Sequence, residues 1–221
     1  HVATATTKSE PIARLRKVKH RNQKPLAIMA HDLETVKSFA EVSPREAVLL
    51  TSYIKPIVLL KKKNDFLLSE LISPGLNNIG VMLPYTGLHA MLFDKVREPA
   101  FVMTSANPPN EPIVTENAEA IKKLGSVVDF FLFHNRTIAH RCDDPVIRLH
   151  GEDQSIIRRS RGYAPEPVHL KRLANSCALG VGAELNVTSC VLLGNKAFIS
   201  QHIGDVGNLE TLGVLKSAIN H

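Results

Sequence analysis

Aromatic residues are scarce in this chain of 221 residues, which contains no tryptophan and only three tyrosines. Proteins that recognise RNA usually stack exposed aromatic rings on the bases and interleave them with basic side chains. Here most phenylalanines lie in apolar runs, as in the segment 130–133. The net charge of +6 favours anionic partners such as nucleotides, acyl phosphates or nucleic acid. Extended recognition of nucleic acid is the weakest of these possibilities.

Cysteine is scarce as well, and long apolar runs are missing. The three cysteines form no C-x-x-C pair, so neither a disulfide framework nor a zinc knuckle is supported, and we expect reduced thiols, buried at Cys177 and Cys190. No stretch approaches the roughly 20 apolar residues that span a bilayer, and the first residues lack the apolar core of a signal peptide. We therefore expect a cytoplasmic protein that does not bind membranes.

Several nucleotide-binding and hydrolase motifs are absent too. The sequence has no G-x-x-x-x-G-K-[ST], G-x-G-x-x-G, H-E-x-x-H or G-x-S-x-G pattern. The P-loop, Rossmann, zincin and nucleophile-elbow mechanisms therefore lack their sequence marks, and no metal ligands are predicted.

Apolar periodicity predicts strands and helices in mixed order, which is typical of an α/β fold with a twisted mixed sheet. Ser9 and Asp32 are candidate N-caps, Ser43-Pro44-Arg45-Glu46 reads as a capping box, and Lys61–Lys63 as a solvated strand end or edge guard. Helices are expected at residues 10–18, 88–96 and 118–124 and after Asp32, and strands at residues 26–30, 56–60, 79–83, 100–104, 129–133, 145–149 and 155–159.

The composition of the sequence changes after residue 161, where two prolines and a glycine fall within six residues and indicate a turn or linker. Strands at 179–183, 189–193 and 197–200, with a turn at Gly194-Asn195-Lys196, predict the opening hairpin of another domain. We expect a first domain over residues 1–172 and an incomplete second domain over residues 173–221. Because the chain starts at His1 and its last helical pattern has no clear end, we also expect a fragment of a longer protein.

Basic residues gather at one predicted turn between a helix and a strand. Lys19, Arg21 and Lys24 place three cations within six residues, which suits a polyphosphate, because arginine offers a planar fork and lysine a point charge. Basic residues at a helix C-terminus also simply complement the helix dipole. Both interpretations stay open at this point.

Hydroxyl and amide side chains follow the predicted strand 100–104. Thr104, Ser105 and Asn107 lie at its carboxyl end, where open α/β sheets present ligand-binding groups. They could instead only terminate the strand and cap the following turn. Likewise Thr86 is an ordinary N-cap candidate, and His89 is as compatible with a helix face as with catalysis.

Two further clusters carry potential phosphate donors, and one of them also carries carboxylates. The first contains Asp143 and Asp144, which could hold Mg²⁺ beside phosphates or orient neighbouring arginines by ion pairs. We favour ion pairs. The first cluster comprises His134, Asn135, Arg136, His140, Arg141, Asp143 and Asp144, and the second comprises Arg158, Arg159 and Arg161.

Seven segments together resemble one family. The segments KHRNQKPLAIMA, VMLPYTGLHAMLF, VMTSANPPNEPI, HNRTIAHRCDDPVIR and RRSRGYAPEPV are similar to the YrdC-like domain of the carbamoyltransferases that mature nickel–iron hydrogenases, the HypF family. GVGAELNVTSCVL and FISQHIGDVGNLET resemble the start of that family's next domain, of the actin-like, ribonuclease-H-like ATPase type. The resemblance covers the whole chain.

The resemblance implies an ATP-dependent enzyme. Its family uses carbamoyl phosphate and ATP, with Mg²⁺ accompanying ATP, to make a carbamoyl-adenylate. The carbamoyl group then passes to the C-terminal cysteine of a partner maturation protein and becomes the cyanide ligand of the hydrogenase iron. Double-stranded RNA binding is known for related domains.

The resemblance also assigns site residues. Lys19 and Arg21 match the family's basic nucleotide-binding pair, and Thr104, Ser105 and Asn107 match its hydroxyl and amide motif. From these we expect Lys19, Arg21, Ser105 and Asn107 to take part in catalysis. Residues expected around the same cavity are Arg136, Arg141, Asp143, Asp144, Arg159 and Arg161, with His134 and Asn135.

Some features depart from the family. Gly87 stands where proline is expected and Pro145 where serine is expected. A glycine-rich strand before His1, the acylphosphatase and zinc-finger modules, and the metal-binding histidines of the second domain are expected to lie outside this sequence. We therefore expect the fragment to be inactive alone in carbamoyl transfer.

Two other functions remain open. One is threonylcarbamoyl-adenylate synthesis in tRNA modification, which uses the same type of domain. The other is a non-catalytic RNA-binding module, supported by the basic charge balance.

Overall fold

The computed structural model describes all 221 residues, which form two compact units. The first unit comprises His1–Ala106, Leu124–Phe131 and Val146–Ile157. The second comprises Asn107–Lys123, Leu132–Pro145 and Arg158–His221. No helix of either unit has the length and apolar character needed to cross a membrane.

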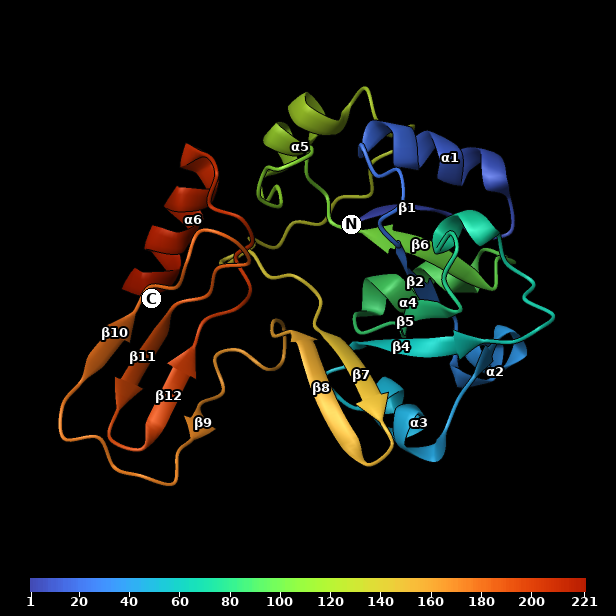
Figure 1. Cartoon of the computed structure of the whole chain (residues 1–221). Helices are drawn as coiled ribbons and strands as arrows, with labels where there is room; N and C mark the ends of the chain where they lie inside the picture. The colour runs from blue at the N-terminus through green and yellow to red at the C-terminus, as the bar shows by residue number, and fades with distance from the viewer. The chain divides into compact units, whose positions relative to one another are not determined.

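The first unit is built on a twisted sheet in the order β1-β6-β2-β5-β4-β7-β8, with β3 paired to β4 (Figure 1). Pairs β2/β5 and β4/β7 are parallel, whereas β1/β6, β6/β2 and β5/β4 are antiparallel. The predicted mixed sheet is therefore confirmed. Its strands are β1 (Val2–Ala5), β2 (Ala27–Ala30), β3 (Ala40–Glu41), β4 (Ile57–Lys62), β5 (Asn78–Met82), β6 (Ala100–Thr104), β7 (Val146–His150) and β8 (Asp153–Arg158).

Helices cover both faces of this sheet because alternate strand residues point to opposite sides. On one face, Ile12 of α1 (Ser9–Val18), Val36 of α2 (Leu33–Phe39) and Leu50 of α3 (Pro44–Thr51) are completely buried in one core. The short helix η1 (Glu70–Ile72) adds Ile72 to that core. On the other face, Phe93 of α4 (Gly87–Asp94) packs against Phe101, with ring centroids 5.1 Å apart.

The second unit contains a four-stranded antiparallel sheet in the order β10-β11-β12-β9 (Figure 1). The predicted hairpin is present, with its turn at Gly194 and Asn195, and Gly194 takes a φ of +59°, which favours glycine. The elements are β9 (Val168–His169), β10 (Ala178–Gly180), β11 (Cys190–Leu193), β12 (Lys196–Ile199), α6 (Leu209–Asn220) and most of α5 (Asn117–Leu124). The domain boundary after residue 172 stays a prediction.

Two expectations about local structure are wrong. No strand forms at residues 129–133, where Phe130 is 91% exposed, so this apolar run gains no sheet neighbour to bury it. Ser9 is not the N-cap of α1, which is Lys8, and the Ser9 hydroxyl instead lies 2.8 Å from the hydroxyl of Ser69. In contrast, the capping box from Ser43 to Glu46 is complete.

The lysine run and the thiols also differ from expectation. Lys62 is not solvated, because β4 continues through it inside the sheet. Its ammonium lies 2.6 Å from a Glu70 carboxylate oxygen and 4.6 Å from the centre of the Phe66 ring. Cys177 is exposed and Cys190 is partly exposed, so neither is the buried thiol that the sequence suggested.

The N-cap of α2 supplies a test of local stability. The Asp32 carboxylate accepts a 2.7 Å hydrogen bond from the Thr35 amide, and this bond, followed by contacts with the Thr35 and His31 side chains, lowers the pKa of Asp32. Asp32→Ala should lower the free energy of unfolding at neutral pH by about 1 kcal/mol, measured by urea denaturation.

The pH dependence follows from the lowered pKa. The Asp32 contribution is fully present above the unfolded-state pKa of about 4 and is lost as the pH falls through the lower folded-state pKa. The difference between wild type and Asp32→Ala should therefore shrink below about pH 4. Asp32→Asn keeps the cap without the charge and should lose less stability at neutral pH. An Asp32→Ala deficit that stays constant down to acidic pH would contradict this explanation.

Candidate functional site in the first unit

One contact joins the basic turn to the polar strand end. The ammonium of Lys19 donates a 3.0 Å hydrogen bond to the carbonyl oxygen of Ser105, although the two residues are 86 positions apart. Lys19 is only 6% exposed, so its charge is held inside the protein at the end of β6. Two predicted site residues from separate segments are thus side by side.

Strand register explains why these segments meet. In the antiparallel pair β2/β6, Ile28 lies opposite Val102, and continuing this register places Leu26 opposite Thr104. The turn that precedes β2 therefore lies at the edge of the sheet where β6 ends. On the other side of β6, Val2 lies opposite Thr104, so β1 begins at the same edge.

The end of α1 sets the direction of the basic turn. The amide of Arg21 donates to the carbonyl of Arg16 at 2.9 Å, and the amide of His20 donates to that of Lys17 at 3.3 Å, while His20 takes a φ of +50°. This is the Schellman pattern, which closes a helix with one left-handed residue. It places Arg21 two residues after the helix cap, half-buried, whereas Lys24 is exposed.

A buried arginine that the sequence analysis missed supports this turn. Arg16 is 7% exposed and donates from Nε to the carbonyl of Leu71 at 2.6 Å and from Nη1 to that of Arg21 at 2.8 Å. Burial lowers the pKa of Arg16, but arginine stays charged. The sequence signal was weak, because Arg16 lies among other basic residues of an amphipathic helix.

An aromatic cluster lies on the face of the sheet opposite α1. The rings of Tyr85 and His89 are in T-shaped contact with centroids 4.6 Å apart, and the ring of His1 lies 5.7 Å from that of His89. Thr86 caps α4 by accepting from the His89 amide at 3.2 Å, which confirms its prediction as an N-cap.

Candidate functional site in the second unit

The remaining predicted site residues belong to the second unit, and the proposal that all of them line one cavity stays a prediction. Asn107 donates from its amide to the carbonyl of Glu111. The Glu111 carboxylate in turn lies 2.6 Å from Lys123. Hydrogen bonds to Glu111 and then to Glu119 raise the pKa of Lys123. The ion pair between Lys123 and Glu111 ties this loop to α5.

Two of the predicted arginines are tied to main-chain carbonyls. Arg141 donates from Nε to the carbonyl of Ile113 at 2.7 Å. Arg159 donates to the carbonyls of Ile199, at 2.8 Å, and Glu166, and its burial lowers its pKa. The first contact connects the loops around residues 113 and 141, and the contacts of Arg159 connect the loop around residue 166 with the end of β12.

The two adjacent carboxylates contact arginines, in line with the ion-pair role that we favoured. One oxygen of Asp144 accepts from Nη2 of Arg161 at 3.0 Å, and the Asp144 side chain is only 10% exposed. Asp143 lies 4.0 Å from Arg158. Arg136 is exposed, as are His134 and Asn135, and the main-chain amide of Arg136 donates a 3.2 Å hydrogen bond to Nδ1 of His134.

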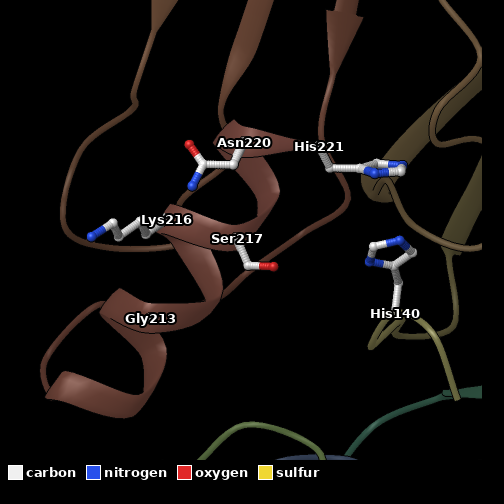
Figure 2. A pocket seen from close by; sticks show the side chains of 6 residues that line it. All are labelled: His140, Gly213, Lys216, Ser217, Asn220 and His221. Carbon is white, nitrogen blue, oxygen red and sulfur yellow. The ribbon is translucent and has the colours of Figure 1, made fainter.

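A cavity of about 480 Å³ lies along α6 (Figure 2). The imidazoles of His140 and His221 face each other with centroids 4.3 Å apart, while Figure 2 shows Lys216 pointing away from them. None of the predicted catalytic residues lines this cavity. Its lining residues are His140, Gly213, Lys216, Ser217, Asn220 and His221.

Comparison with known proteins agrees with these features. Residues 1–160 match the Sua5–YciO–YrdC family, described as "Telomere recombination", and residues 173–221 match the "HypF Kae1-like domain". Probable carbamoyltransferase HypF of Methanocaldococcus jannaschii is 44% identical over all of this chain and 29% of its own length. Carbamoyltransferase HypF2 of Cupriavidus necator is 41% identical, with the same coverage.

Solved structures give the same result. The structure of full-length HypF in a phosphate- and nucleotide-bound form matches the whole chain and 35% of its own, with a TM-score of 0.95 and 42% identity. That of T. kodakarensis HypF matches the whole chain and 29% of its own, with a TM-score of 0.94 and 48% identity. P. abyssi Sua5, at 19% identity and a TM-score of 0.63 over 75% of this chain and 47% of its own, shows the fold alone.

Residues 1–160 therefore have the YrdC-like fold. The chain belongs to the HypF family of carbamoyltransferases, with a YrdC-like domain followed by part of a Kae1-like domain. It spans about three-tenths of the length of the curated relatives it matches.

The carbonyl contacts of Arg159 predict a structural role that needs no ligand. Arg159→Ala leaves the carbonyls of Ile199 and Glu166 without this donor and should lower the free energy of unfolding by about 1–3 kcal/mol. Arg136→Ala, which removes an exposed arginine, should change it by less than about 0.5 kcal/mol. Urea denaturation without nucleotide checks both, and equal stability of the two variants would refute the structural role.

Proposed function

We propose that this chain forms carbamoyl-adenylate from ATP and carbamate, as the adenylate-forming part of a hydrogenase-maturation carbamoyltransferase. The single observation that carries the proposal is the 3.0 Å contact between Lys19 and Ser105, which places the basic turn beside the hydroxyl-bearing strand end. Membership of the HypF family supports it, as does the solved relative described as phosphate- and nucleotide-bound.

The chemistry needs cations rather than a covalent nucleophile. A carbamate oxygen attacks the α-phosphorus of ATP, a bond forms between them, and the bond from that phosphorus to the pyrophosphate oxygen breaks. Negative charge develops on the leaving pyrophosphate, and positioned lysine and arginine side chains stabilise it. We assign phosphate binding to Lys19 and Arg21, which come from one turn.

Neutral donors would orient the reacting groups. Ser105 lies next to the Lys19 ammonium, and its hydroxyl can donate to a phosphate or carbonyl oxygen. Thr104, the buried last residue of β6, fixes the start of this polar segment. Asn107 is assigned to the carbamoyl end of the intermediate. Holding both reactants in line is the main catalytic contribution of such groups.

Mg²⁺ is proposed to arrive with ATP. Asp144 is engaged by Arg161, and Asp143 lies near Arg158, so both carboxylates have cationic neighbours in the protein. Phosphate oxygens and water are the usual ligands of Mg²⁺ in nucleotide sites. We therefore assign the metal to the triphosphate rather than to a protein cage.

The source and destination of the carbamoyl group complete the proposal. Carbamoyl phosphate is proposed as the source of carbamate, and the C-terminal cysteine of a hydrogenase-maturation partner as the final acceptor. The match of residues 173–221 to the HypF Kae1-like domain supports this reaction over threonylcarbamoyl-adenylate synthesis. The likeness to the solved Sua5 structures supports only the fold.

The reaction is tested by product analysis. The protein is incubated with ATP and Mg²⁺ in two separate reactions. One contains carbamate, generated from carbamoyl phosphate by an added acylphosphatase, and the other contains threonine and bicarbonate. The adenylates formed are identified by mass spectrometry. We expect carbamoyl-adenylate. Threonylcarbamoyl-adenylate would establish the alternative enzyme, and salt-sensitive RNA binding without any ATP consumption would establish an RNA-binding module.

Substitution at the basic turn provides a second test. Arg21→Ala should lower the rate of adenylate formation by about 10–100-fold, because it removes a charge-assisted contact worth about 1.5–3 kcal/mol. Lys24→Ala is the matched control, since Lys24 lies in the same turn but is exposed, and should change the rate less than about threefold. An Arg21→Ala rate equal to wild type would argue against phosphate binding there.

A further inference from the structure

The guanidinium of Arg16 donates hydrogen bonds to four main-chain carbonyl groups, although Arg16 belongs to an amphipathic helix. Besides its bonds to Leu71 and Arg21, it donates from Nη1 to the carbonyl of Asn22 at 3.4 Å and from Nη2 to that of Ile72 at 3.3 Å. All four acceptors are main-chain carbonyl oxygens. Two belong to the basic turn and two to η1, so one guanidinium links the turn to the core of the first unit.

We propose that Arg16 is a positioning residue for nucleotide binding, holding the turn of residues 19–22 so that Lys19 and Arg21 present their charges to the phosphates. This inference rests on the function proposed above and adds a residue that acts through its neighbours. Arg16 is buried beneath the turn and is not assigned a contact with the nucleotide.

The geometry explains why an arginine serves here. Its planar fork has five N–H donors in fixed directions, and three of its nitrogens donate at Arg16. A lysine offers one flexible point charge and cannot link two chain segments with the same precision. The Schellman closure orients the turn at His20, and the guanidinium then fixes the two carbonyls that follow it.

The choice of acceptors has an electrostatic consequence. Because carbonyl oxygens are dipoles without net charge, they stabilise the Arg16 cation without cancelling it. Arg16 therefore adds to the positive potential of Lys19 and Arg21 instead of reducing it, as a carboxylate partner would. A polyanion that approaches this edge of the sheet meets three cations supported by one helix end.

The experiment compares Arg16→Lys with wild type in ATP·Mg²⁺ affinity, measured by calorimetry, and in hydrogen exchange of amides 19–24. We expect a folded variant with about tenfold weaker binding and faster exchange in the turn. Arg45→Ala is the control: Arg45 also donates to a main-chain carbonyl, that of Glu152, but is not part of this turn. Its affinity for ATP should equal that of wild type.

A mutant cycle separates positioning from general destabilisation. In a Lys19→Ala/Arg21→Ala background, Arg16→Lys should weaken the remaining ATP binding less than twofold, because the cations it positions are gone. A tenfold effect that persists in that background, or unchanged ATP affinity of folded Arg16→Lys, would overturn the inference. If the wild-type protein does not bind ATP, the proposed function is wrong. If it binds ATP, and Arg21→Ala weakens that binding but Arg16→Lys does not, only the positioning role of Arg16 is wrong.

Discussion

The candidate site depends on one buried cation, the ammonium of Lys19, which donates a hydrogen bond to the carbonyl oxygen of Ser105. A buried charge is costly unless the protein supplies polar partners, so this contact constrains both chain segments. It ties the end of α1 to the end of β6. Because of the register of β1 and β2 against β6, the start of β1, the residues before β2 and the end of β6 all lie at the same edge of the sheet. The first unit thus forms a cationic, hydroxyl-bearing edge from residues that are far apart in sequence. Arg16 stabilises this edge through its hydrogen bonds to the carbonyls of Arg21 and Asn22.

Arginines serve two different purposes in this chain. In the first unit, Arg16 binds carbonyls and leaves its charge uncancelled next to other cations. In the second unit, Arg141 and Arg159 connect loops through carbonyls, and Arg161 pairs with the nearly buried Asp144. The basic residues expected around one phosphate site therefore include arginines that stabilise the fold through contacts within the protein. The net charge of +6 alone does not distinguish these arginines from those that could bind phosphate.

Local patterns predicted most of the fold because they depend on neighbouring residues. The capping box at Ser43, the strands around β2, β5 and β6, and the hairpin at Gly194 all follow from spacing and turn chemistry. Expectations failed where tertiary contacts decide the outcome. The run at 129–133 gains no strand neighbour, and Lys62 is buried in contact with Glu70 and Phe66. Arg16 gives no signal in the sequence because two of its four carbonyl partners lie 55 and 56 residues away. The site residues themselves were suggested by the family resemblance, since each motif alone allowed an ordinary structural interpretation.

The most direct test is a crystal structure of the protein with a non-hydrolysable ATP analogue and Mg²⁺. We expect the triphosphate to lie at the edge formed by the turn of residues 19–24 and the end of β6, in contact with Lys19, Arg21 and Ser105. A triphosphate bound elsewhere, for example in the cavity along α6 beside His140, with the basic turn uninvolved, would contradict this expectation.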